Sequence, residues 1–291
     1  MKFGYISVSG RPNVGKSTLI NTIIGLKVAA ISPKPQTTRN RIIGIKNSQD
    51  YQIAFIDTPG LHKPKDELTR FMISEAKSAL DVADVVYHLV EPTRITEDDE
   101  YAMKMIKSIT QKPIFCIITK IDLVKKSDLF PMIDHLKEKY SEIIPVSAVK
   151  NMGISELVET TVKYLPEGER MFPEDQFTDQ PIKLVVAEII REKIFTYTHQ
   201  EVPYSTAVEV EEISERQNGM LYIKSVIYTE RANQRMIILG KNGAMIKKIG
   251  TLARKEIEIW TKKRVYLDLF VKVTEDWTKN RLFIKKFFLV S

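Results

Sequence analysis

A loop near the start of the chain, GRPNVGKS at residues 10–17, has the residue types that hold phosphate groups. It matches the pattern G-x-x-x-x-G-K-[ST] at every fixed position. The glycines let backbone N–H groups turn toward an anionic oxygen, and a following helix adds the partial positive charge of its N-terminus. Lys16 is placed to reach the β- and γ-phosphates, and Ser17 offers a hydroxyl to Mg²⁺. The loop predicts a nucleoside triphosphate site formed by Gly10, Arg11, Pro12, Asn13, Val14, Gly15, Lys16, Ser17 and Thr18.

Two further stretches supply groups that a triphosphate site with magnesium needs. DTPG at residues 57–60 ends an apolar run, so Asp57 falls at the carboxyl end of a predicted strand, where it can hold the water shell of Mg²⁺. Gly60 offers a backbone N–H to the γ-phosphate. In PQTTR at residues 35–39, we expect Thr38 to be the second hydroxyl ligand, with Thr37 as the alternative. The predicted magnesium ligands are Ser17, Thr38 and Asp57.

Two loops later in the chain predict that the base is guanine. In TKID at residues 119–122, Asp122 can accept hydrogen bonds from the guanine N1 and N2 donors, and the Lys120 stem can lie against the base. Ser147 and Ala148 begin a loop that would close over the guanine O6. The usual guanine motif is N-K-x-D, and Thr119 departs from it. Because a hydroxyl cannot make both hydrogen bonds of an amide, we expect a weaker tie between this loop and the phosphate loop.

The same residues predict slow hydrolysis of the triphosphate. Hydrolysis needs positioned phosphates, neutralised charge and an oriented water molecule. The candidate catalytic groups are Lys16, Thr38, Gly60 and Asn13. Leu61 follows DTPG, where many signalling GTPases carry the glutamine that orients the water. Because leucine cannot orient water, we expect an intrinsic turnover on the order of 10⁻³ s⁻¹.

A second glycine-lysine loop, GKNG at residues 240–243, lacks the four-residue spacer and the trailing Ser or Thr of a nucleotide loop. G-x-x-G between two helical stretches is instead how KH domains clamp single-stranded nucleic acid. Residues 181–291 hold 20 basic and 13 acidic side chains, whereas residues 1–180 hold 24 of each. This excess of positive charge favours a polyanionic partner. The predicted RNA-binding residues are Gly240, Lys241, Asn242, Gly243, Ile246, Lys247 and Lys248.

The composition is that of a globular protein, with 43% hydrophobic and 28% charged residues. The chain has no apolar run long enough to span a membrane and no secretory leader, so we expect a cytoplasmic protein. The lone Cys116 excludes an internal disulfide framework and a cysteine-based metal site. It lies in the apolar stretch PIFCIIT, which favours a packed core position.

The order of elements predicts two domains and a linker. Residues 1–165 alternate apolar β-branched runs with amphipathic helical stretches, which predicts a doubly wound α/β domain with a six-stranded, mostly parallel sheet and one antiparallel edge pair. Residues 166–181 contain three prolines, several acidic side chains and few apolar ones, which is typical of a linker. Residues 182–291 read as a helix, two strands, two helices and a strand, an α+β domain.

These stretches together resemble the Era family of bacterial GTPases over nearly the whole chain. The resemblance rests on GRPNVGKSTLIN, PQTTRNRIIGI, DTPGLH, FPEDQFTDQP, AEIIREKI and GKNGAMIKKIG. It implies a P-loop GTPase joined to a type II KH domain, with GTP or GDP and Mg²⁺ as ligands. It also implies binding to the 3′ end of 16S ribosomal RNA, a role in maturation of the 30S subunit and peripheral association with the membrane. Thr119 stands where the family usually has Asn.

Several alternatives stay open from the sequence. Asn13 either holds a potassium ion beside the phosphates, as in similar GTPases, or only shapes the turn. The chain could also be an RNA-binding chaperone with a structural nucleotide, or a membrane-surface GTPase that uses its apolar and basic ending FIKKFFLV. We expect a monomer in which GTP orders the loop around Thr38 and so changes access of RNA to the KH surface.

Overall fold

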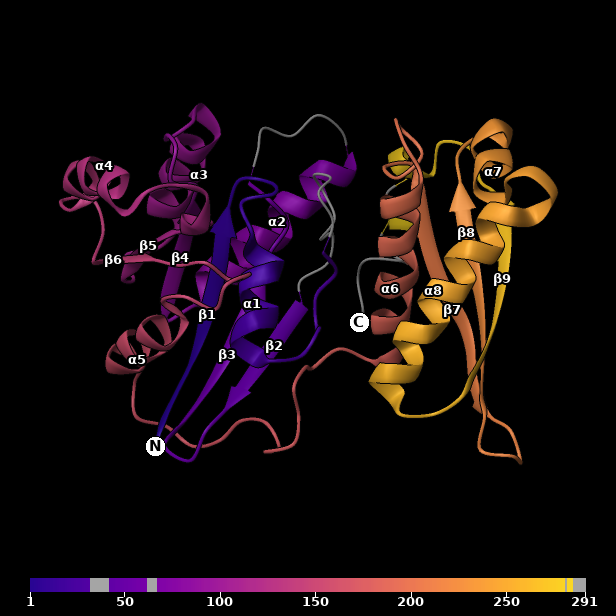
Figure 1. The fold of residues 1–291 in the computed structure, drawn as a ribbon, viewed down its shortest axis with the longest axis horizontal. Coiled ribbons are helices and arrows are strands. Elements are labelled where there is room, and N and C mark those ends of the chain that lie inside the picture. The colour runs from indigo at the N-terminus through magenta and orange to yellow at the C-terminus, as the bar shows by residue number, and fades with distance from the viewer. Residues whose placement is uncertain (32–41, 62–66, 281, 285–291) are drawn as a thin grey trace. The chain divides into compact units, whose positions relative to one another are not determined.

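The computed structural model describes residues 1–31, 42–61, 67–280 and 282–284 (Figure 1). Cα distances place residues 1–31, 42–61 and 69–179 in one compact unit and residues from 180 onward in a second. Each unit buries an apolar core of its own. This division follows from the change of sequence pattern, because each unit pairs its own strands and covers them with its own helices.

The first unit is built on a six-stranded sheet with the strand order β2-β3-β1-β4-β5-β6. The pair β2–β3 is antiparallel, and the other four neighbouring pairs are parallel. The prediction of a mostly parallel sheet with one antiparallel edge pair is confirmed. The strands are β1 (Lys2–Gly10), β2 (Ile42–Asn47), β3 (Tyr51–Asp57), β4 (Val85–Val90), β5 (Ile114–Ile118) and β6 (Glu142–Pro145).

Helices cover both faces of this sheet, which explains why its strands are apolar at nearly every position. On one face, Tyr87 of β4 is buried with Leu19 and Leu157. The next residue back, Val86, points to the opposite face and is buried with Ala102. The helices of this unit are α1 (Lys16–Ile24), α2 (Glu67–Val82), α3 (Glu97–Ile109), α4 (Leu129–Leu136) and α5 (Ile154–Tyr164).

Residues 166–179, the main part of the expected linker, form no helix or longer strand but hydrogen-bond along the first unit. The Phe3 N–H donates to the Pro166 carbonyl at 3.2 Å, and the Ile45 N–H donates to the Phe177 carbonyl at 2.9 Å. The amide oxygen of Gln52, a buried residue of β3, accepts from the Phe172 N–H at 3.0 Å. These hydrogen bonds satisfy backbone groups that the lack of regular structure would otherwise leave unpaired.

The second unit has a three-stranded sheet of order β7-β8-β9, in which β7 and β8 are antiparallel and β8 and β9 are parallel. Apolar side chains of α6 and α8 form the core with this sheet, for example Ile190, Ile257 and Ile223. The predicted order of helix, two strands, two helices and strand is confirmed. The elements are α6 (Ile182–Tyr197), β7 (Thr206–Glu215), β8 (Leu221–Thr229), α7 (Ala232–Leu239), α8 (Ala244–Thr261) and β9 (Val265–Val273).

Helix α8 contributes one apolar face to this core. Its buried residues Ile249, Ala253 and Ile257 recur every four residues, so they lie on one face of the helix. That face packs in the core of the second unit. Arg254 and Lys255, on other faces of α8, are exposed. The helix is therefore amphipathic and leaves basic side chains accessible to a partner.

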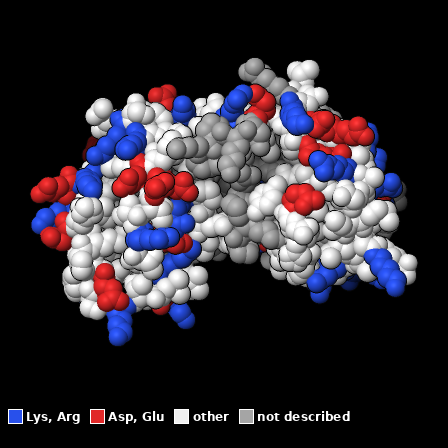
Figure 2. Space-filling view, turned by 90° about the horizontal axis from the view of Figure 1, so that it is seen from above, with Lys and Arg blue, Asp and Glu red and all other residues white. Residues whose placement is uncertain are grey.

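On the face shown in Figure 2, outside the residues drawn in grey, lysine and arginine side chains are interspersed with acidic ones.

Cys116 is buried in the first unit, and burial raises the pKa of its thiol to about 12, as expected for a packed core residue. Within the described ranges, no helix has both the length and the apolar character needed to cross a membrane.

Candidate nucleotide site and nucleic-acid groove

The phosphate loop joins the end of β1 at Gly10 to the start of α1 at Lys16. Gly10 has a φ of 147°, and a Cβ there would lie 2.8 Å from the Leu89 carbonyl oxygen. Gly15, the residue before α1, has a φ of 107°. Both positions therefore require glycine, and this backbone directs the N-terminus of α1 at the loop.

Lys16 lies over this loop. Its Nζ donates hydrogen bonds to the carbonyl oxygens of Gly10 at 3.3 Å and Arg11 at 3.0 Å. Burial lowers the pKa of the ammonium to about 8, although the nearby Asp57 carboxylate acts in the opposite direction. An anionic phosphate at this position would raise the pKa of Lys16 again.

The predicted magnesium ligands Ser17 and Asp57 lie together. The Ser17 hydroxyl, from the first turn of α1, donates to a carboxylate oxygen of Asp57 at 2.7 Å. A hydroxyl and a carboxylate at the phosphate end of α1 fit a magnesium ion, which prefers oxygen ligands and shares them with phosphates. The other predicted ligand, Thr38, and its alternative Thr37 lie outside the described residues.

The DTPG loop packs directly on the phosphate loop. A Cβ at Gly60 would lie 2.8 Å from the ring of Pro12, so only glycine allows this approach. The next residue, Leu61, is fully buried with Leu80, and its N–H donates to the Gly10 carbonyl at 3.0 Å. Leu61 thus serves as a core residue, in agreement with the expectation that it orients no water.

Thr119 ties the guanine loop to the phosphate loop. Its hydroxyl is a hydrogen-bond donor that lies 2.7 Å from the Val14 carbonyl oxygen and 3.1 Å from the Val90 carbonyl oxygen. The Lys120 ammonium adds a hydrogen bond of 2.9 Å to the Asn13 carbonyl. The side chains of Thr119 and Lys120 therefore both connect the guanine loop to the phosphate loop, where we expected a weak connection.

The base-reading residues also meet. The Ser147 hydroxyl donates to a carboxylate oxygen of Asp122 at 2.6 Å, which orients the carboxylate predicted to read guanine. The Ala148 carbonyl accepts from the Thr22 hydroxyl of α1 at 3.3 Å, so this loop is held against the helix that follows the phosphate loop. Asp122 is exposed and accessible to a ligand.

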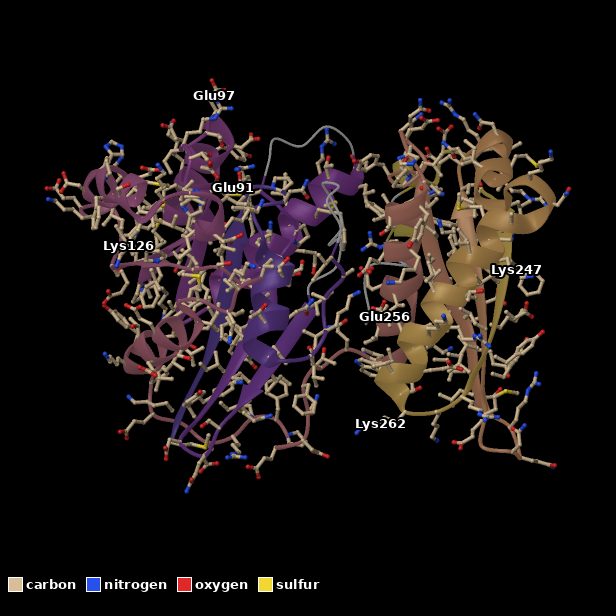
Figure 3. The ribbon with its side chains drawn as sticks, viewed as in Figure 1. Glu91, Glu97, Lys126, Lys247, Glu256 and Lys262 are labelled. Atoms are coloured by element: carbon tan, nitrogen blue, oxygen red, sulfur yellow. The ribbon has the colours of Figure 1, made fainter. Side chains whose placement is uncertain are left out.

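A carboxylate that was not predicted from the sequence, Glu91, lies between these two loops. It forms ion pairs with Arg11, at 2.5 Å, and with Lys120. Figure 3 labels Glu91 among the side chains of the first unit. Partial burial acts to raise its pKa, but Lys120 and Arg11 outweigh this and lower the pKa of Glu91. Glu91 directly follows β4, and its place after a parallel strand is the signal that could have identified it.

The second glycine loop is exposed at the junction of α7 and α8. Gly240 has a φ of 71°, and a Cβ there would lie 2.7 Å from that of Met245. Gly243 has a φ of 76° with open space around it. Lys241 and Asn242, between the glycines, are exposed. The loop is therefore accessible to a ligand, as the KH prediction requires.

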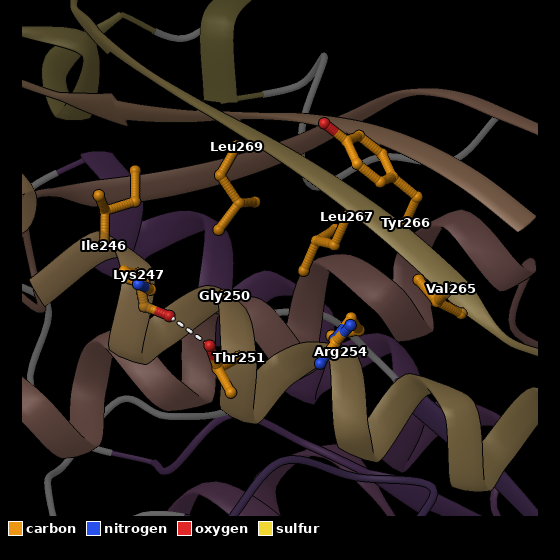
Figure 4. Close-up of a pocket in the computed structure, with 9 residues that line it drawn as sticks. All are labelled: Ile246, Lys247, Gly250, Thr251, Arg254, Val265, Tyr266, Leu267 and Leu269. Carbon is orange, nitrogen blue, oxygen red and sulfur yellow. Dashed lines mark hydrogen bonds between the residues drawn. The ribbon is translucent and has the colours of Figure 1, made fainter. Parts of the chain in front are cut away.

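A groove of about 330 Å³ lies between α8 and β9 (Figure 4). Gly250 has no side chain, and a Cβ there would lie 3.2 Å from Leu269, so β9 approaches the helix closely. Leu267 and Leu269 extend from β9 toward α8. The groove is lined by Ile246, Lys247, Gly250, Thr251, Arg254, Val265, Tyr266, Leu267 and Leu269.

The groove includes two of the predicted RNA-binding residues, Ile246 and Lys247. Lys248 points elsewhere, because its ammonium lies 4.0 Å from the centre of the Tyr197 ring on α6. Arg254 also lines the groove and was not predicted from the sequence, although it follows Lys247 by seven residues and so lies on the same helix face. The β9 residues carry no local signal, because only the tertiary fold brings them to α8.

Two family models match this chain, one in each unit. A family described as "50S ribosome-binding GTPase" matches residues 5–120, and one described as "KH domain" matches residues 201–278. GTPase Era from Geobacter sp. (strain M21) is 46% identical over 286 residues, which cover 98% of this chain and 96% of that protein. GTPase Era from Thermotoga maritima is 46% identical over 279 residues, or 94% of this chain and 93% of that protein.

Two crystal structures are similar over nearly the whole chain, each with a TM-score of 0.95 and 44% identity. One is Era in complex with MgGDPNP and nucleotides 1506–1542 of 16S ribosomal RNA, and the match covers 99% of this chain and 98% of that one. The other is a variant of Aquifex aeolicus Era bound to GDP·AlF₄⁻, with 99% of both chains covered. With this identity over nearly its full length, and with both glycine loops in place, the chain belongs to the Era family of GTPases.

Proposed function

We propose that this chain binds GTP with Mg²⁺, hydrolyses it to GDP and phosphate, and binds the 3′ end of 16S ribosomal RNA during maturation of the 30S subunit. The observation that carries the RNA part is the exposed Gly240–Gly243 loop, which stands next to the groove between α8 and β9. A related Era in complex with 16S ribosomal RNA nucleotides supports the same assignment.

At the nucleotide site, the chain's own residues position the phosphates and read the base. Lys16 and the N-terminus of α1 hold the phosphates, while Asp122, oriented by Ser147, accepts from guanine. Ser17 and Asp57 would hold Mg²⁺, which neutralises charge on the phosphates when it is bound. Since Leu61 is buried, its side chain cannot orient the attacking water, and we expect intrinsic turnover on the order of 10⁻³ s⁻¹.

In the groove, the two kinds of lining residue match the two parts of a single-stranded RNA. The apolar side chains of Ile246, Leu267 and Leu269 can contact bases, and Lys247 and Arg254 can contact phosphates. The open space at Gly243 lets a sugar-phosphate backbone approach the start of α8.

Gly243→Asp tests the RNA part. The new Cβ meets no atom within 4 Å, so the change adds a negative charge at the loop without a clash. We expect the variant to lose at least about tenfold in affinity for an RNA of nucleotides 1506–1542, the segment in the related complex, with unchanged GTP hydrolysis.

Gly219→Asp is the matched control. Gly219 lies in the turn between β7 and β8, has a φ of 75° and also has no atom within 4 Å of its Cβ position. The backbone strain and the added charge are therefore the same, but the groove is not touched. Equal RNA affinity of the two variants would contradict the assignment of the Gly240–Gly243 loop to RNA.

We also propose that Asn13 in the phosphate loop holds a potassium ion beside the phosphates. Asn13 has a φ of 63° within the phosphate loop, a conformation that asparagine tolerates, and similar GTPases use asparagine here to hold the ion. Hydrolysis is then faster in potassium than in sodium salts. Equal rates would leave Asn13 with its role in the turn alone.

The other parts of the proposed function rest on membership in the Era family. We propose a cytoplasmic monomer with peripheral association at the inner membrane, in which the bound nucleotide changes access of RNA to the KH groove. RNA affinities measured with GDP and with a non-hydrolysable GTP analogue test this coupling, and identical values would refute it.

A further inference from the structure

Glu91 connects the phosphate loop to the guanine loop. Its carboxylate pairs with Arg11 of the phosphate loop and with Lys120 of the guanine loop, and Lys120 in turn bonds to the Asn13 carbonyl. We propose that Glu91 is a positioning residue that sets the guanine loop against the phosphate loop and so contributes to selectivity for guanine. This inference rests on the proposed guanine nucleotide site.

The contacts form a closed ring that begins and ends in the phosphate loop. From Arg11 the ring passes to Glu91, then to Lys120 and back to the backbone of Asn13. The Glu91 side chain is 23% exposed and that of Arg11 is 20% exposed, so water screens this ion pair less than a pair on an open surface, whereas the Lys120 side chain is 38% exposed.

The ring is anchored to α3 as well. Arg11 lies 3.2 Å from a carboxylate oxygen of Asp99, whose side chain is fully buried. Asp99 is fixed because it accepts from the Thr96 N–H at 2.9 Å in the capping box that begins α3. Arg11 is therefore held from two sides, and Glu91 has a fixed partner on the phosphate-loop side.

In the guanine loop, Lys120 needs a fixed ion-pair partner of the kind that Glu91 provides. Its backbone has a φ of 55°, in the left-handed region that is unfavourable for a lysine. This turn places Thr119 toward Val14 and leads the chain to Asp122, two residues later. The ion pair with Glu91 stabilises the turn and hence the position of the carboxylate that reads the base.

Thr119 makes the role of Glu91 more important in this chain. The Thr119 hydroxyl carries one hydrogen for donation, whereas an asparagine amide carries two and also offers an acceptor. The ring through Glu91 supplies a second connection between the two loops. An asparagine at position 119 should then reduce the dependence on Glu91.

The test compares the affinities of GDP and IDP, because IDP lacks the N2 amino group that Asp122 reads. We expect Glu91→Ala to weaken GDP binding about tenfold and IDP binding less than threefold, so that the ratio of the two affinities falls. Glu91→Gln, which keeps an acceptor but loses the charge, should fall between Glu91→Ala and the unmodified chain. Glu97→Gln is the matched control, since Glu97 is an exposed acidic residue at the start of α3 outside this ring (Figure 3).

Rescue is tested with Thr119→Asn. In the Glu91→Ala background it should restore GDP affinity to within threefold of the unmodified chain, which is a larger gain than the one it produces when Glu91 is present. An unchanged ratio of GDP to IDP affinity in Glu91→Ala, or the same effect of Thr119→Asn in both backgrounds, would overturn the inference. Failure of the unmodified chain to bind GDP would overturn the proposed nucleotide site as well, so the two failures are distinguishable.

Discussion

The Ser17 hydroxyl and the Asp57 carboxylate are joined by a hydrogen bond of 2.7 Å. It connects the first turn of α1 to the carboxyl end of β3, two elements that are 40 residues apart in the chain. Because β1, which leads into the phosphate loop, is parallel to β3, the ends of both strands meet at one edge of the sheet. This edge is where the magnesium-bound phosphates are proposed to lie.

Ser17→Ala should slow GTP hydrolysis by roughly 10²-fold, because the chain loses a ligand of the ion that neutralises the phosphates. The measurement is the hydrolysis rate as a function of Mg²⁺ concentration, with a higher half-maximal concentration expected for the variant. Ser17→Thr keeps the hydroxyl and should remain within a few-fold of the unmodified chain. Equal Mg²⁺ dependence of all three proteins would contradict the role of Ser17.

Nucleotide affinity should fall with rising pH above about 8. Burial lowers the pKa of Lys16 to about 8 in the chain without nucleotide, and bound phosphates raise it again. Above pH 8 the Lys16 side chain is mainly a neutral amine and must therefore take up a proton on binding, which weakens the affinity by up to about tenfold per pH unit. Calorimetry at about pH 8.5 in two buffers of different ionisation enthalpy measures this uptake, and Lys16→Ala should abolish it.

His88 should make the first unit sensitive to acid. It is 1% exposed on β4, and burial lowers its pKa from 6.5 to about 4. As the pH falls from 6.5 to 4, the unfolded chain binds a proton at this residue before the folded chain does, so stability is lost over that window. Between about pH 7 and pH 5 the loss is roughly 2 kcal/mol.

Urea unfolding at about pH 7 and pH 5 measures this effect, with His88→Gln as the comparison. The variant loses the hydrogen bond that His88 forms with the Tyr140 hydroxyl at 2.7 Å, so it should be less stable at neutral pH. Its further loss of stability in acid should nevertheless be smaller than that of the unmodified chain. Parallel losses in the two proteins would contradict the assignment of this acid sensitivity to His88.

Two adjacent lysines should differ in their effect on RNA binding. Lys247 lines the groove, whereas Lys248 lies over the Tyr197 ring. Lys247→Ala should weaken RNA binding roughly threefold to tenfold and reduce the slope of affinity against salt concentration by about 0.7 to 1. Lys248→Ala removes the same charge one residue later and should change both quantities less. A larger effect from Lys248→Ala would contradict the groove as the RNA site.

Much of the nucleotide site could be predicted from the sequence because its residues follow strands. A parallel sheet brings the residues after its strands to one edge, so Lys16, Asp57, Asp122 and Ser147 could be assigned from short motifs and their order. The fold class followed from the change between the first part of the chain, with its continuous apolar runs, and the second part, in which apolar and polar residues alternate. These signals are local, and each is complete within a few residues.

Only the tertiary structure decided which residues far apart in the sequence contact each other. The Thr119 hydroxyl reaches Val14 across 105 positions, and Glu91 joins Arg11 to Lys120, although no spacing rule links these residues. The groove likewise needs β9 beside α8, which places Leu269 against Gly250. Such contacts depend on how helices and strands pack, because periodicity gives the face on which a side chain lies but not the neighbour that it meets.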